Sequence, residues 1–102
     1  MQLFKKLFID PFKEKYYIYS DKHTNGCIRV FWKKNRSGYT TDLQKAGVYY
    51  YEDVMNDSVR YPLLTCVTDL VEYKKRRFDT FYIKKKDVEK ILGPIKTVCV
   101  SV

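Results

Sequence analysis

The pattern of apolar and polar positions near the N-terminus predicts a β-hairpin. Residues 16–20 are aromatic or β-branched around a single serine, which is typical of a strand. The polar stretch at residues 21–26 ends in Asn-Gly, a strong signal for a tight turn. In residues 27–33 every even-numbered position is apolar, as in a strand with one buried face. We expect that buried face to carry Ile28, Val30 and Trp32.

Turn and helix signals divide the rest of the chain into short elements. A turn is predicted at residues 35–39, and a brief helical turn at residues 41–47, with Thr41 or Asp42 as N-cap and Gly47 as C-terminal cap. Residues 63–73 favour a strand at their beginning and fit either a helix or a strand after it. Further strands are predicted at residues 48–51, 78–83 and 97–102, and short helices at residues 1–9, 52–57 and 87–92.

These elements predict one domain, residues 1–102, of the α+β class. We expect a mainly antiparallel sheet of about four to six short strands with two or three short helices. The 102 residues are 45% hydrophobic, too apolar for a disordered basic tail, although the formal net charge is +8. No stretch approaches the roughly 20 apolar residues of a membrane span, and residues 1–6 do not resemble a signal peptide. We therefore expect a cytoplasmic protein.

The sequence offers little for catalysis or metal binding. His23 is the single histidine, and the cysteines do not have metal-ligand spacing. Acidic pairs such as Glu52 with Asp53 have the spacing of any solvated helical turn, and no Gly-rich phosphate loop or nucleophile elbow is present. We expect a non-enzymatic protein without a metal or another cofactor. The apolar or β-branched neighbours of the cysteines predict buried free thiols at Cys27, Cys66 and Cys99.

Two sequence motifs lie close together in the middle of the chain. Residues 31–39 have the form aromatic-Trp-x-x-Asn-x-x-Gly-Tyr, and residues 43–49 the form Leu-x-x-Ala-Gly-x-Tyr. At this spacing the motifs resemble a family of small phage and prophage proteins of unassigned function. The similarity extends over residues 16–51, and a weaker likeness covers residues 82–92. The resemblance implies a phage or prophage origin and action in the cytoplasm of a bacterial host, and it brings no catalytic residues.

Basic residues gather in two runs that flank the predicted strand at residues 78–83. Lysine and arginine side chains grouped at a strand end can contact phosphates, so both runs are candidates for binding nucleic acid or an acidic partner. Alternatively, they are solvated strand ends that suppress edge-to-edge pairing. Whether the runs meet in one patch is left open. They comprise Lys74, Lys75, Arg76 and Arg77, and Lys84, Lys85 and Lys86.

Two further sets of side chains are candidate binding residues. Three consecutive tyrosines in a strand turn at least one ring outward, and such a ring can anchor a protein partner or stack on a base. Polar residues in the turns before and after residues 27–33 are candidates for a small-ligand site, although turn geometry explains them equally well. The tyrosines are Tyr49, Tyr50 and Tyr51, and the turn residues are His23, Asn35, Arg36, Tyr39 and Thr40.

Three hypotheses for function follow. The first is a phage-encoded binding protein that inhibits a host defence complex, such as a CRISPR effector, by stoichiometric occlusion of a host protein or nucleoprotein. The excess of positive charge argues against a DNA mimic, which would present carboxylates. The second is a nucleic-acid-binding accessory protein of phage replication or gene control. The third is a sponge for a nucleotide or another small ligand.

Overall fold

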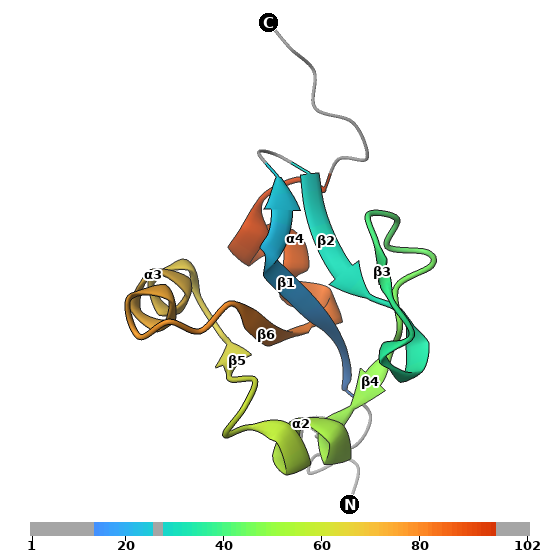
Figure 1. The fold of residues 1–102 in the computed structure, drawn as a ribbon, viewed down its shortest axis with the longest axis horizontal. Helices are drawn as coiled ribbons and strands as arrows, with labels where there is room; N and C mark the ends of the chain where they lie inside the picture. The colour runs from blue at the N-terminus through green and yellow to red at the C-terminus, as the bar shows by residue number, and fades with distance from the viewer. Residues whose placement is uncertain (1–13, 26–27, 96–102) are drawn as a thin grey trace, which may run out of the picture.

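The computed structural model of the chain describes residues 14–25 and 28–95. The predicted helix at residues 1–9, the predicted strand at residues 97–102, and the thiols of Cys27 and Cys99 lie outside these ranges. Within them, six strands form one sheet with short helices packed against it (Figure 1), so the predicted α+β class is confirmed. The strands are β1 (Lys15–Asn25), β2 (Ile28–Trp32), β3 (Tyr39–Thr40), β4 (Tyr49–Tyr50), β5 (Leu63–Leu64) and β6 (Thr80–Lys84). The helices are α2 (Tyr51–Asp57), α3 (Val67–Lys75) and α4 (Val88–Leu92), with 3-10 turns η2 (Lys34–Arg36) and η3 (Lys85–Asp87).

Strand β1 lies at the centre of the sheet. The strand order is β3-β2-β1-β6-β5, and β4 pairs with the first residues of β1. The pairs are antiparallel except for β5 and β6, which run parallel. A parallel pair needs a long crossover connection, which α3 provides here. The segment at residues 63–73 therefore begins as a strand, as predicted, and continues as a helix.

Both faces of the sheet are buried, which corrects the prediction of a single core face at residues 27–33. Along β1, Tyr17 packs in the cluster that contains α4, and its neighbour Ile18 packs on the other face in the cluster that contains α2. Phe31, on the face expected to be polar, is 0% exposed, whereas Trp32 is only partly buried. Alternation does not identify the inner face of β2 because helices cover the sheet on both sides.

The hairpin of β1 and β2 is confirmed, but β1 is longer than predicted and distorted near its end. Ser20 pairs with Val30 and Asn25 with Ile28, so β1 carries several more residues between these pairs than β2 does. The Thr24 hydroxyl donates to the Ser20 carbonyl oxygen (2.8 Å) and accepts the N–H of Val30 (3.1 Å). This side chain replaces ladder hydrogen bonds that the irregular register removes. The predicted turn at residues 21–26 is therefore largely part of the strand.

The segment that precedes β4 crosses the loop after β2 at very close range. Residues 41–47 form a hydrogen-bonded turn rather than the predicted helical turn. The N–H of Gly47 donates to the carbonyl oxygen of Trp32 (2.9 Å), and a β-carbon at Gly47 would lie 2.6 Å from the backbone nitrogen of Lys34. Gly47 is therefore required by the contact between two backbones and does not act as a left-handed cap. This contact fixes the β2–β3 loop beside β4.

Candidate functional site

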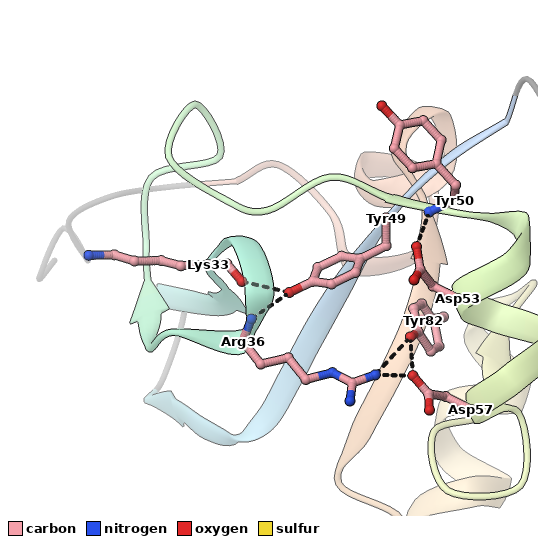
Figure 2. Close-up of polar contacts among 7 residues, drawn as sticks. All are labelled: Lys33, Arg36, Tyr49, Tyr50, Asp53, Asp57 and Tyr82. Atoms are coloured by element: carbon pink, nitrogen blue, oxygen red, sulfur yellow. Dashed lines mark hydrogen bonds and ion pairs between the residues drawn. The ribbon is translucent and has the colours of Figure 1, made fainter.

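The three consecutive tyrosines lie at the junction of β4 and α2 and take different environments. Tyr49 is 8% exposed. Its hydroxyl donates to the carbonyl oxygen of Lys33 (2.6 Å) and accepts the N–H of Arg36 (3.2 Å; Figure 2). Tyr51 is partly buried against the α2 side of the sheet. Tyr50 is 49% exposed, and Figure 2 shows its ring pointing away from the polar cluster, so Tyr50 is the outward-facing ring.

Asp53 fixes the start of α2 next to Tyr50. Its carboxylate accepts the backbone N–H of Tyr50 (2.8 Å), which satisfies a donor at the N-terminus of the helix. The negative charges of Glu52 and Asp53 in the first turn also favour the helix dipole. Sequence analysis missed Asp53 as a site residue. An acid at the third helical position is a capping signal that would have placed the helix start correctly.

Behind Tyr49, Arg36 joins the β2–β3 loop to α2 and β6. Its guanidinium forms an ion pair with Asp57 and donates to the Tyr82 hydroxyl (3.3 Å), which itself donates to Asp57 (2.7 Å; Figure 2). The guanidinium also lies over the ring of Tyr61, 5.5 Å from its centroid. Because all of these groups partner one another, Arg36 holds the loop in place and is not a free cation for a ligand. Asp57, Tyr61 and Tyr82 were not predicted, because nothing in their sequence spacing relates them to Arg36.

The β2–β3 loop is strained at two successive residues. Asn35 and Arg36 both have a φ of 56°, a left-handed conformation that asparagine tolerates well and arginine less well. Consecutive positive φ values are typical of a tight turn between antiparallel strands. The contacts of the Arg36 side chain, together with the hydrogen bond from its N–H to the Tyr49 hydroxyl, stabilise this strained conformation. The loop is therefore a rigid support for the neighbouring surface.

Two open depressions flank this support and share Asp53. One, of ≈ 320 Å³, is lined by Asn35, Arg36, Tyr49 and Asp53. The other, of ≈ 290 Å³, is lined by Tyr50, Tyr51, Glu52 and Asp53. Sites for small ligands normally enclose most of the ligand surface, whereas both depressions are partly open to solvent. Their shape suits contact with a macromolecule better than capture of a nucleotide.

The tyrosine hydroxyls around Arg36 are held in their neutral form. Burial raises the pKa of Tyr49 above its ordinary value of 10.0, and burial raises the pKa of Tyr82 to about 12. Arg36 opposes both shifts but does not cancel them. At neutral pH these hydroxyls are hydrogen-bonding groups and do not supply a base.

The predicted turn residues are divided between two places. Asn35 and Arg36 belong to the loop just described. The rings of His23 in β1 and Tyr39 in β3 lie together, with centroids 4.0 Å apart. The Nδ1 atom of His23 lies 2.8 Å from the Ser20 hydroxyl. The Thr40 hydroxyl accepts the N–H of Asp42 (3.1 Å). These residues therefore do not line one common cleft.

The two basic runs lie at opposite ends of the paired strands β1 and β6. Lys74 pairs with Asp21 late in β1 (3.1 Å), and Lys86 pairs with Glu14 just before β1 (2.9 Å). The extended chain between Glu14 and Asp21 spans roughly 20 Å. The hydrogen bond that the Lys86 amine donates to the Glu14 carboxylate also raises the pKa of Lys86. The runs do not merge into one patch.

Other cations of the basic runs also have partners. Lys75 pairs with Glu72 (3.4 Å), the Arg76 guanidinium lies over the Phe78 ring (5.9 Å), and the Lys85 amine lies over the Tyr17 ring (5.9 Å). Lys84 ends β6, and Arg77 has a φ of 69° at the turn after α3. Contacts of this kind draw the charges toward the protein surface. Most cations of the two runs therefore already have a partner within the protein.

Cys66 contradicts the prediction of buried thiols. It is exposed and lies between β5 and α3, where residues 65–68 all face solvent. Its apolar neighbour Val67 is itself 54% exposed, so apolar neighbours in the sequence did not indicate burial here.

No group of three or more histidine, cysteine or acidic side chains in residues 14–25 and 28–95 is arranged to hold a metal ion. None of the helices in the same residues has the length and apolar character needed to cross a membrane. No protein-family model, curated protein or solved structure matches the chain. What the protein does must be inferred from its own residues.

Proposed function

We propose that the chain is a non-enzymatic binding protein that occludes a bacterial host protein or nucleoprotein by stoichiometric binding. We further propose that this binding serves phage counter-defence, for example inhibition of a CRISPR effector. The phage setting rests on the resemblance carried by residues 31–39 and 43–49. The binding mode rests on one observation, an exposed apolar surface along α2.

This surface, the α2 surface, carries three large apolar side chains in one short segment. Tyr50 is 49% exposed, Met55 56% and Val59 91%. Aromatic residues and methionine are enriched in protein interfaces, because they bury much apolar area at a small loss of side-chain freedom. Three exposed apolar side chains within residues 50–59 favour an interaction site in this segment.

The surroundings of the α2 surface favour a protein partner. Tyr50 stands on a helix start that Asp53 caps, next to a loop that Arg36 anchors, so little ordering is needed on binding. Glu52 is exposed beside the ring and supplies the polar rim that surrounds the apolar centre of a typical interface. The separation of the two basic runs weakens the alternative of nucleic-acid binding through them. The solvent-open depressions weaken the alternative of a small-ligand sponge.

Affinity capture from a bacterial lysate, with and without nuclease, tests the proposal. Wild-type chain is compared with Tyr50→Ala/Met55→Ser, which alters the α2 surface. Its matched control is Val67→Ser/Val71→Ser, which removes exposed apolar side chains from α3. We expect a specific protein to survive nuclease with wild type and control. Retention by the α2 variant should fall at least tenfold, since central interface anchors each contribute about 2 kcal/mol or more.

Circular dichroism should show all three proteins equally folded, because the substituted side chains are exposed. Equal retention by the two variants would contradict the role of the α2 surface. Retention of nucleic acid alone, lost on nuclease treatment, would favour an accessory protein of phage replication or gene control.

A further inference from the structure

We infer that the chain carries a second binding site, for single-stranded nucleic acid, on the sheet beside β3. This site is separate from the α2 surface and does not depend on the function proposed for it. It consists of a row of rings, here called the aromatic stripe, and of neighbouring lysines in the sequence that have no carboxylate partner within the described residues. The stripe comprises His23, Tyr39, Trp32 and Tyr61.

The rings of the stripe follow one another across the sheet. Ring centroids are 4.0 Å apart from His23 to Tyr39, 5.3 Å from Tyr39 to Trp32 and 6.1 Å from Trp32 to Tyr61. Tyr39 and Trp32 are directly paired residues of β3 and β2, so their side chains share one face of the sheet. Trp32 and Tyr61 also pack against the cluster that contains α2. The stripe therefore extends that buried cluster toward the edge of the sheet.

The outer end of the stripe is exposed and already ordered. Tyr39 is 43% exposed, and His23 also faces solvent. The distorted end of β1 brings His23 onto the Tyr39 ring, and the hydroxyl of Ser20 holds its Nδ1 at 2.8 Å. Ordered aromatic faces that meet solvent are what unpaired bases stack on. The bases of a duplex are already stacked on one another, so we do not expect them to stack on such a surface.

The charge around the stripe suits a phosphate backbone. Lys22, Lys33 and Lys34 are exposed and form no ion pair within the described residues. Figure 2 shows the Lys33 amine extending away from the polar cluster around Tyr49. Two carboxylates of this region are paired with other cations: Asp21 pairs with Lys74, and Asp57 pairs with Arg36. These three lysines are therefore available to phosphates, unlike most cations of the two basic runs.

Fluorescence anisotropy with labelled oligo-dT and oligo-U of about twelve nucleotides, a length within the usual range for one small domain, tests this inference. Tyr39→Ala should weaken binding about tenfold or more, since each stacked base commonly contributes that much. With three phosphate contacts, the logarithm of the binding constant should fall with the logarithm of the salt concentration with a slope of about −2. For Lys33→Ala/Lys34→Ala this slope should be less steep than about −1. Trp32 is the single tryptophan and contacts Tyr39, so its emission should change on binding to wild type.

The matched control is Lys75→Ala/Lys85→Ala, which removes equal charge, one lysine from each basic run. It should change affinity less than twofold. The inference is overturned if neither oligonucleotide binds, if the control weakens binding as much as the Lys33/Lys34 variant, or if a duplex of equal length competes equally well. It is also overturned if Tyr39→Ala leaves oligonucleotide binding intact but abolishes capture of a host protein. Because Tyr39 and Tyr50 are changed separately, failure here leaves the α2 surface standing.

Discussion

Replacing Gly47 by alanine is expected to lower the free energy of unfolding by about 3 kcal/mol, the upper part of the range for overpacking. The added β-carbon would lie 2.6 Å from the Lys34 nitrogen, 2.7 Å from the Lys33 carbonyl carbon and 2.8 Å from the Lys34 α-carbon. These are backbone atoms, so no side chain can rotate away to make room. For a domain of this size the melting temperature should fall by roughly 15 °C.

Gly93→Ala provides the comparison for Gly47→Ala. Gly93 has a φ of +82° just after α4, but among the described residues, its chain neighbours aside, no atom would lie within 4 Å of a β-carbon at this position. Only backbone strain opposes alanine at this position, where a ψ of −178° accompanies the positive φ, and the expected loss is about 2 kcal/mol. Urea unfolding, monitored by Trp32 fluorescence, measures the loss of stability in both variants. A loss at Gly47 no greater than that at Gly93 would contradict the close crossing of residues 33–34 and 47.

Stability is expected to fall steeply between pH 10 and pH 12. Burial raises the pKa of Tyr82 from 10.0 to about 12, so in this interval the unfolded chain releases a proton that the folded chain keeps. The contribution of the protonated Tyr82 hydroxyl to the free energy of unfolding is fully present below pH 10. It is lost as the pH rises through the pKa of the folded state. By pH 12 the ionisation of this one group lowers the free energy of unfolding by about 2 kcal/mol. The raised pKa values of Tyr16, Tyr17, Tyr19 and Tyr49 act in the same direction.

Tyr82→Phe separates this effect from general alkaline unfolding. At neutral pH the variant should be less stable by about 1–2 kcal/mol, because Asp57 and Arg36 lose the Tyr82 hydroxyl. Between pH 10 and pH 12 its stability should fall less steeply than that of wild type. Urea unfolding at a series of pH values gives both slopes. Parallel slopes would show that Tyr82 ionises normally in the folded chain.

The two sequence motifs are largely explained by the loop that they build. Asn35 takes a positive φ, and Gly38 has a φ of 132°. Gly47 allows the close crossing, and the Tyr49 hydroxyl closes the loop onto Lys33. The motifs therefore indicate how residues 31–50 fold more directly than they indicate a ligand.

Local signals predicted much of the fold. The hairpin of β1 and β2, the strand at the start of residues 63–73 and the helix ended by Gly93 depend on residues close in sequence, and all three are present. The parallel pairing of β5 with β6 depends on a crossover and has no local signature. Burial of Phe31 could not be predicted either, because it requires α4 to cover the second face of the sheet.

The proposed binding surfaces were less predictable because they depend on strand register. Strand alternation alone predicted that at least one of the three consecutive tyrosines faces outward, and Tyr50 is that exposed ring. The basic runs are close in sequence, but the strand between them keeps them apart, and their acidic partners come from β1. The contact of His23 with Tyr39 requires both the irregular register of β1 and the pairing of β3 with β2.

A titration of the partner's activity distinguishes the proposed stoichiometric occlusion from catalytic turnover. The partner retained after nuclease is purified, and its own activity is measured at fixed concentration while the chain is added in steps. Occlusion predicts a linear loss of activity that is complete near one chain per partner, with Tyr50→Ala/Met55→Ser shifting the curve to a large excess. Complete loss at a small fraction of one chain per partner would indicate catalytic turnover and would contradict the account, as would undiminished activity at saturation.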